Sequence, residues 1–435
     1  MLSVFILIIE IAILHTIKSM EIISINNVVA SLLIFAFSMS FIVSVQNNVE
    51  LQKYANQLIA GYSFRILLLY FDLFGKRILV LPQSGADSAM FYDASKNWAL
   101  YGIESKRGFF VYLMRLLFSF IGVNRLYSQF LLMLFSIGAI LVFIHIIEKL
   151  NTGEKIKKQA VWILCLLPNF ALLSSLFLRE SIVTFIITLS LYYLLEWMRN
   201  GRIAVFFVSI MISLLGCLFH SGCIGITLGY VVCALLYDTE KQIIHTSFSG
   251  ILVAITVALV IGSLYLNYGD ILLSKFLKVE TLQDIANTRG GAGSSYVQYV
   301  GDSSNAFSMI IYTMPRIVYF LFSPFPWQWR GQSDIIAFFF SGMYYLLTIK
   351  NAIGYLCSHE QKNREIVICM LMVAFFCTFI FAWGVSNTGT ASRHRDKMIC
   401  LYNIIYTLST TATLSLNDDK ESVIANCNQK KYIYH

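Results

Sequence analysis

Long apolar runs alternate with short polar connections along almost the whole chain. A helix that crosses the hydrocarbon core of a bilayer needs about 20 mostly apolar residues, and most of these runs approach that length. The pattern predicts an all-α, polytopic membrane protein that forms a single transmembrane domain over residues 1–435. We expect about twelve spans, at residues 2–17, 22–45, 57–74, 126–147, 160–177, 181–197, 203–220, 222–237, 248–267, 335–349, 365–385 and 398–416.

Two further apolar stretches, 108–122 and 306–322, each contain an arginine. If both crossed the membrane, the polar segments that flank each of them would lie on opposite faces. We therefore expect two interfacial or re-entrant helices, one in an outer loop at 75–125 and one in an outer loop at 268–334. The alternative is that both are ordinary short spans.

The composition supports the membrane assignment and narrows the function. Only 13% of the residues are charged and 57% are hydrophobic, whereas soluble domains carry about 25% charged residues. This excludes a soluble enzyme, a disordered protein and a nucleic-acid-binding domain, so the net charge of +8 predicts no nucleic-acid partner. The nine cysteines form no CxxC pair, and no cluster has metal-ligand spacing, so we expect neither a metal site nor a cofactor.

The positive charges predict the orientation. Lysines gather in the connections 149–159, 350–364 and 417–435, and positive residues favour the cytoplasmic side. With twelve spans, both termini are then cytoplasmic. Ten of the 14 arginines fall on the outer side. Because arginine binds phosphate in a bidentate manner, this side is suited to an anionic lipid head group.

The first outer loop contains the sequence GADSAMFYDASKNWALYG at 85–102. Its Asp87 and Asp93 flank an aromatic pair, Phe91 and Tyr92. A carboxylate at the membrane surface can act as a base or orient a sugar hydroxyl, and an aromatic ring suits the face of a sugar. A solvated loop with two ordinary acids is the alternative.

Three ionisable residues interrupt apolar sequence at predicted span ends. Arg179 and Glu180 lie in SSLFLRESIVTF, and His220 lies in LFHSGCIG. Ionisable groups at membrane depth are costly and therefore mark functional sites or ion pairs. Histidine is a common general base, although a histidine on an apolar helix is also often a core residue.

Three later segments carry candidate anion-binding residues. The segment SNTGTASRHRDKM, just before the last predicted span, is the strongest because four of five consecutive residues are basic or histidine. The glycine-rich NTRGGAGSSYV and the proline-rich MPRIVYFLFSPFPWQWRG are open to simpler interpretations as a flexible loop and an aromatic belt. The candidate residues in these segments are Arg289, Arg316, Arg330, Arg393, His394 and Arg395.

Taken together, the Asp/Tyr loop, the FLRE turn, the FHS helix end and the GTxxRHR segment resemble the bacterial polysaccharide polymerases of the Wzy type, including the EpsG-like branch. The resemblance covers most of residues 80–400. It implies an all-helical fold related to the GT-C glycosyltransferases, in the bacterial cytoplasmic (inner) membrane. The chain departs from many family members in dividing its outer polar residues between two loops.

The resemblance also implies an activity. Undecaprenyl-pyrophosphate-linked oligosaccharide repeat units would be joined on the outer side of the membrane, with a chain-length regulator and a flippase as partners. Arg179, Arg393 and Arg395 would hold the pyrophosphate, and His220 or an outer acid would deprotonate the acceptor. Three alternatives stay open: a GT-C glycosyltransferase, an O-antigen ligase, and a non-enzymatic transporter of lipid-linked glycan.

Overall fold

The structure is a computed structural model that describes residues 2–19, 27–82, 84–97, 108–244, 248–253, 255–256, 306–358, 363–383, 385 and 387–410. These residues are almost entirely helical. The first half contains α1 (Leu2–Ser19), α2 (Asn27–Asn47), α3 (Val49–Gln52), α4 (Ala55–Phe74), α5 (Ala86–Lys96), α7 (Phe109–Ile121), α8 (Arg125–Glu148), α9 (Glu154–Leu166), α10 (Pro168–Ser175) and α11 (Glu180–Asn200).

The second half contains the remaining elements. They are α12 (Ile203–Phe219), η1 (Ser221–Cys223), α13 (Ile224–Leu236), β1 (Tyr237–Asp238), β2 (Ile243–Ile244), α17 (Ala306–Phe322), η3 (Pro326–Gln328), α18 (Gln332–Ala337), the π-helical turn η4 (Phe338–Gly342), α19 (Met343–Cys357), α20 (Arg364–Trp383), α21 (Thr388–Arg395) and η5 (Asp396–Met398). Residues 399–410 continue as a helix. β1 and β2 form a short antiparallel hairpin.

Six helices in the described ranges are long and apolar enough to cross a membrane, and the bent pair of α9 and α10 would make a seventh. The all-α membrane class is therefore supported, but the expected twelve spans are not. Several apolar helices are too short, because 17 residues of α-helix extend only about 25 Å. The predicted spans 248–267 and 398–416 lie partly outside the described residues. The six are Asn27–Asn47, Ala55–Phe74, Arg125–Glu148, Glu180–Asn200, Gln332–Cys357 and Arg364–Ala382.

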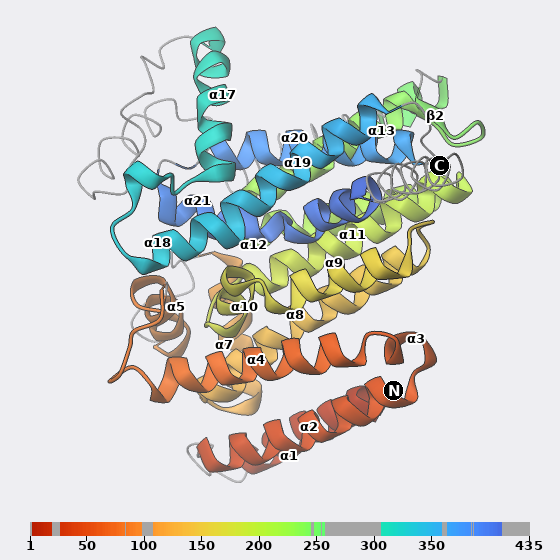
Figure 1. Ribbon diagram of the computed structural model, residues 1–435. Helices are drawn as coiled ribbons and strands as arrows, with labels where there is room; N and C mark the ends of the chain where they lie inside the picture. Colours follow the sequence, from red (N-terminus) through yellow and green to blue (C-terminus); the bar gives the residue numbers. More distant parts are fainter. Residues whose placement is uncertain are drawn as a thin grey trace, which may run out of the picture.

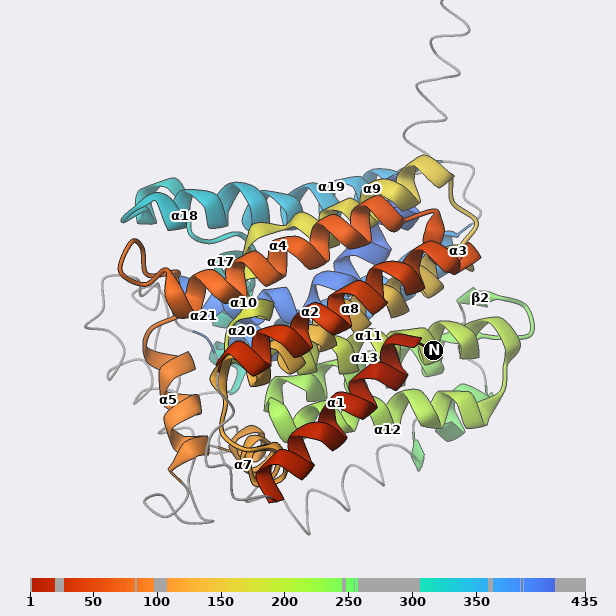
Figure 2. The same ribbon diagram turned by 90° about the horizontal axis from the view of Figure 1, so that it is seen from below.

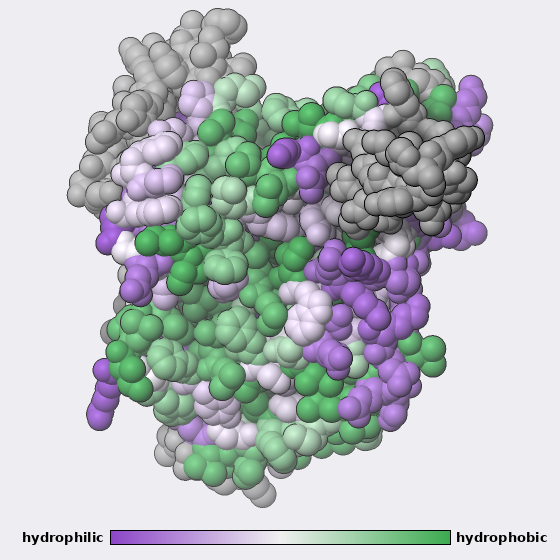
Figure 3. Space-filling model, viewed as in Figure 1, coloured by the Kyte–Doolittle hydropathy of each residue, from purple (hydrophilic) through white to green (hydrophobic). Residues whose placement is uncertain are grey.

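The outer surface of the bundle is apolar, as a bilayer requires. Val28, Leu32, Phe35, Met39 and Val43 form a stripe along α2, and each is between 43% and 63% exposed. Figure 3 shows a broad hydrophobic surface on one face of the molecule, with hydrophilic residues gathered toward one end. Such a large exposed apolar surface would be unfavourable in water and is favourable in lipid.

The long helices run side by side, and α11 packs against both α8 and α12 while α13 packs against α20. α17 crosses the direction of the bundle in Figure 1, and α5 crosses it in Figure 2, near the same end as α18 and α21. α7 and α17 occupy the two stretches in which lateral helices were predicted. The loop at 85–102 contains α5, a helix that the sequence did not lead us to expect.

The predicted span 160–177 is broken at Pro168, where α9 and α10 meet at 48°. Proline has no N–H to donate to the carbonyl of Leu164, so the end of α9 needs another donor. Arg65 of α4, which is fully buried, supplies it: Nη2 lies 3.0 Å from Leu164 O and Nη1 lies 2.7 Å from Cys165 O. The break directs the chain into the turn that precedes α11.

Candidate functional site

Seven ionisable side chains from separate parts of the sequence meet at the end of the bundle where α5 and α21 lie. We call them the ion cluster: Asp87 of α5, Arg179 and Glu180 at the start of α11, His220 at the end of α12, Arg393 and His394 of α21, and Lys397 of η5. All but Lys397 belong to the predicted site residues.

Arg393 is the centre of the ion cluster. Its Nε donates to Glu180 Oε1 at 2.5 Å, and its Nη1 donates to Asp87 Oδ2. The Arg393 and Glu180 side chains are 8% and 5% exposed, whereas that of Asp87 is 45% exposed. Arg393 therefore joins a buried carboxylate to one that remains open to ligands.

Local sequence explains why Glu180 and Arg393 reach this position. Glu180 is the first residue of α11, where a carboxylate is favoured by the helix dipole. Asn387 caps α21 by accepting a hydrogen bond from Thr390 N at 2.7 Å. The cap fixes where α21 begins and so sets the direction of Arg393, two turns later.

Lys397 adds a third cation. Its Nζ lies 3.4 Å from Glu180 Oε1, and its side chain is fully buried. Burial lowers the pKa of Lys397 to about 7, although the negative charge of Glu180 opposes this shift. With Arg179, Arg393 and Lys397 against Asp87 and Glu180, the ion cluster carries one surplus positive charge when Lys397 is protonated.

Arg179 is tied to the backbone at the end of α12. Its Nη1 donates to Phe219 O at 2.7 Å, and its guanidinium lies 5.7 Å from the centre of the Phe91 ring. Its buried Nε has no hydrogen-bond partner among the described residues. Part of its hydrogen-bonding capacity is therefore unused within the described residues.

The two histidines pack edge to face, with ring centres 4.5 Å apart. His220 Nδ1 accepts a hydrogen bond from Gly222 N at 3.1 Å, so in this state the proton of a neutral His220 ring lies on Nε2. Burial, and next the positive charge of Lys397, hold the pKa of His394 well below its ordinary value. His220 is thus placed to donate a hydrogen bond rather than to accept a proton at Nε2.

Arg395, two residues from Arg393, faces a different environment. Its Nε donates to Ser341 Oγ at 2.8 Å, and its Nη1 donates to Leu321 O at 3.0 Å. Arg395 is fully buried, so these contacts favour a structural role that holds α21 against η4 and α17. Asp396 shares this network through Ser341 at 3.1 Å, and burial raises the pKa of Asp396 to about 6.

Two other predicted site residues, Tyr92 and Arg330, lie outside the ion cluster. Tyr92 packs edge to face against Phe177, at 5.4 Å between ring centres. Arg330 pairs with Asp334 one turn later, at 2.9 Å, and is half-exposed. Arg316 is half-buried on α17, and Arg289 lies outside the described residues.

The sequence did not lead us to predict a second buried polar network, which joins α4, α5 and α8. Gln129 of α8 donates to Asp72 Oδ2 of α4 at 3.0 Å, and Arg125 Nη2 donates to Ser88 Oγ of α5 at 3.0 Å. Arg125 Nε also donates to Gln129 at 2.9 Å. The signal was present in the sequence, because Asp72 and Gln129 are polar residues within predicted spans.

Among the described residues, no group of three or more His, Cys, Asp or Glu side chains is arranged to hold a metal ion. No protein-family model matches the chain, and no curated protein or solved structure is significantly similar to it.

Proposed function

We propose that the protein is a polysaccharide polymerase that joins undecaprenyl-pyrophosphate-linked oligosaccharide repeat units at the outer face of a bacterial cytoplasmic membrane. The observation that supports this most is the convergence of Arg179, Arg393 and Lys397 beside the part-exposed Asp87. A surplus of positive charge beside an accessible carboxylate suits a reaction in which an anionic group leaves while a hydroxyl attacks. The GT-C relationship is part of this proposal.

In the proposed reaction, the pyrophosphate of the donor binds beside Arg393 and Arg179. It competes with Asp87 for Arg393 Nη1, while Glu180 keeps hold of Nε. Asp87 is then free to take the proton of the acceptor hydroxyl. The acceptor oxygen attacks the anomeric carbon of the donor glycan, the bond from that carbon to pyrophosphate breaks, and undecaprenyl pyrophosphate leaves with the electron pair.

Asp87 is the base that the geometry favours over the other two candidates. Glu180 is buried and shared by Arg393 and Lys397, which stabilise its charged form and reduce its basicity. The Nδ1 lone pair of His220 is occupied by Gly222 N. The carboxylate of Asp87 is more exposed than that of Glu180, the other acid in the ion cluster.

The composition of lipid-linked glycans in a strain without the gene tests the proposal. Single complete repeat units on the lipid, with no polymer, are the expected result. Incomplete repeat units would instead indicate a GT-C glycosyltransferase that adds one sugar. Polymer still on its lipid would indicate an O-antigen ligase, and complete repeat units that stay on the inner leaflet would indicate a transporter.

A further inference from the structure

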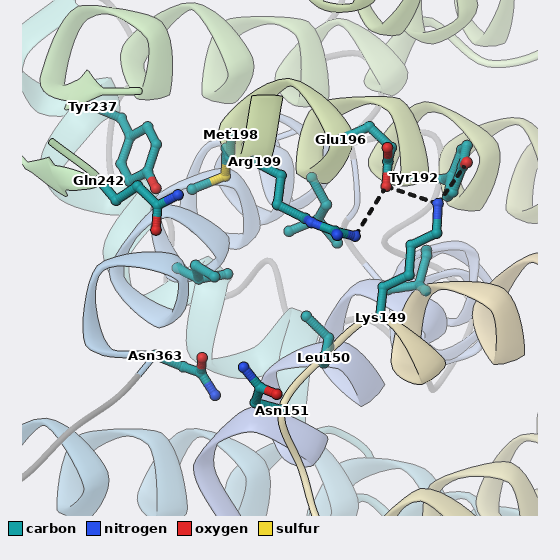
Figure 4. Close-up of a pocket in the computed structure, with 13 residues that line it drawn as sticks. Lys149, Leu150, Asn151, Tyr192, Glu196, Met198, Arg199, Tyr237, Gln242 and Asn363 are labelled. Carbon is teal, nitrogen blue, oxygen red and sulfur yellow. Dashed lines mark hydrogen bonds and ion pairs between the residues drawn. The ribbon is translucent and has the colours of Figure 1, made fainter. Parts of the chain in front are cut away.

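A cavity of about 510 Å³ lies at the opposite end of α11 from the ion cluster. Glu180 and Glu196 are 16 residues apart on this helix, which corresponds to about 24 Å. The ends of α8 and α11, the β1–β2 hairpin and the start of α20 form the walls (Figure 4). None of the residues that line the cavity takes part in the proposed reaction.

Two cations in the wall of the cavity share one carboxylate. Lys149 Nζ donates to Glu196 Oε1 at 2.8 Å and to the hydroxyl of Tyr192 at 2.9 Å. Arg199 Nη1 lies 3.7 Å from the same oxygen of Glu196, and its side chain is 61% exposed. Three charged groups therefore leave one surplus positive charge, and Arg199 makes no side-chain hydrogen bond to the part of the chain that the structure describes.

Three amide side chains complete the wall: Asn151, Gln242 and Asn363. Figure 4 shows Asn151 and Asn363 on the opposite side of the cavity from Arg199 and Glu196, with their amide groups directed into the space between. No side-chain hydrogen bond ties these three amides to the described residues. Amide N–H groups and an arginine fork are the donors that phosphate oxygens accept.

If α8, α11 and α20 cross the bilayer, the cavity lies near the depth of the lipid head groups. α8, α11 and α20 each qualify as a membrane span, and the cavity is formed where two of them end and the third begins. It is also the end that contains the lysine-bearing connection 149–159, which we expect to face the cytoplasm.

We propose that this cavity binds a phosphate group, contributed by the head group of an anionic phospholipid or by a soluble phosphate ester. The surplus positive charge attracts the negative charge that a phosphodiester or a phosphate monoester carries. Arg199 supplies the open guanidinium, the amides supply further donors, and Glu196 limits the affinity by competing for both cations. This inference does not depend on the proposed polymerase activity.

The full-length protein in detergent can be titrated with phosphatidylglycerol, phosphatidylcholine and sn-glycerol 3-phosphate, and binding measured by native mass spectrometry. Arg199→Gln should weaken phosphatidylglycerol binding about tenfold or more, because a charge-assisted hydrogen bond is lost. Glu196→Gln should tighten it, because the competing carboxylate is removed. Arg202→Gln is the matched control: it makes the same charge change on an exposed arginine three residues away that does not line the cavity.

The experiment distinguishes a phospholipid head group from a soluble phosphate ester, and binding of either one supports the site. If glycerol phosphate binds and responds to Arg199→Gln in the same way, the phosphate group alone is sufficient; if only phosphatidylglycerol binds, the ligand is a membrane lipid. The proposal is wrong if neither anion binds more tightly than phosphatidylcholine. It is also wrong if Arg199→Gln and Arg202→Gln weaken binding equally, or if Glu196→Gln weakens it while the protein remains folded.

Discussion

Arg393 links two carboxylates that lie far from it in the sequence, Asp87 and Glu180. A guanidinium can do this because its nitrogen donors lie in a rigid plane and point in separate directions. A lysine at the same position would keep the charge but would donate from a single nitrogen, without the separate directions of the guanidinium plane. Linking Asp87 to Glu180 in this way therefore depends on the planar geometry of the Arg393 guanidinium as well as on its charge.

We expect Arg393→Lys to lower the polymerisation rate by at least ten- to a hundredfold, because each lost charge-assisted hydrogen bond is worth about 1.5–3 kcal/mol. Polymer formed by membranes of matched protein content would measure this. Arg330→Lys is the control, since Arg330 is half-exposed and, among the described residues, pairs with Asp334. Normal polymerisation by Arg393→Lys would contradict the proposed pyrophosphate site.

Asp87→Asn should lower the rate by about 10²–10⁴-fold, which is the usual contribution of a general base. The protein should still accumulate, because asparagine has nearly the same shape and Asp87 is part-exposed. Asp93→Asn, on the same helix but exposed, is the matched control. Equal rates for the Asp87 and Asp93 variants would exclude Asp87 as the base.

The affinity for substrate should depend on pH through Lys397. Because burial disfavours its charged form and lowers its pKa to about 7, Lys397 is protonated below this pH and neutral above it. The ion cluster then loses its surplus positive charge as the pH rises, so KM for the lipid-linked donor should increase between about pH 6 and pH 8. Lys397→Met should show a high KM with no such step; a step of the same size in this variant would assign the titration to another group.

At the scale of single elements, the break between α9 and α10 depends on Arg65. Its guanidinium satisfies carbonyl groups that Pro168 leaves without a helical donor, and Ser136 and Ser174 accept from its Nε at 3.2 and 3.0 Å. The sequence showed an arginine within a predicted span but not its partner. The partner is 99 residues away at Leu164, and only the packing of α4 against α9 and α10 brings the two together.

Arg65→Met should lower the free energy of unfolding by about 2 kcal/mol or more, since buried carbonyls would be left without donors. Thermal unfolding of the purified protein would measure the loss. Arg77→Gln, in the exposed turn that follows the same helix, should leave stability unchanged. An Arg65→Met protein as stable as wild type would mean that the carbonyl groups at the break find other hydrogen-bond donors.

At the scale of the whole molecule, α11 joins two polar sites of different character. The ion cluster lies at its N-terminal end, and the cavity lined by Lys149 and Arg199 lies at its C-terminal end. If α11 crosses the bilayer, the two sites face opposite sides of the membrane. The predicted orientation places the ion cluster at the outer side of the membrane and the cavity at the cytoplasmic side.

Cysteine labelling tests this orientation. The nine cysteines of the chain are first replaced, so that only the introduced cysteine can react. Of the described native cysteines, only Cys357 is exposed. A cysteine at Gly85, beside the ion cluster, should react with an impermeant reagent in intact cells. A cysteine at Lys155 should react only after the membrane is opened, and the reverse result would invert the topology and remove the ion cluster from the outer face.

The sequence by itself determined the class of the protein, because hydropathy and low charge depend on composition and not on packing. It also identified six of the seven members of the ion cluster, because ionisable residues at span ends are costly enough to be conspicuous. It did not give the number of spans correctly. The length of an apolar run does not show where Pro168 will bend a helix, or where a helix such as α13 will end after 13 residues.

Only the tertiary structure decided which of these residues act together. Arg393 and Arg395 are equivalent in the sequence, but two residues on a helix point about 200° apart. One of them meets Glu180 and Asp87, and the other meets the carbonyl groups around η4. The choice depends on how α21 is packed between α17 and the start of α11, which involves contacts between residues more than 200 positions apart.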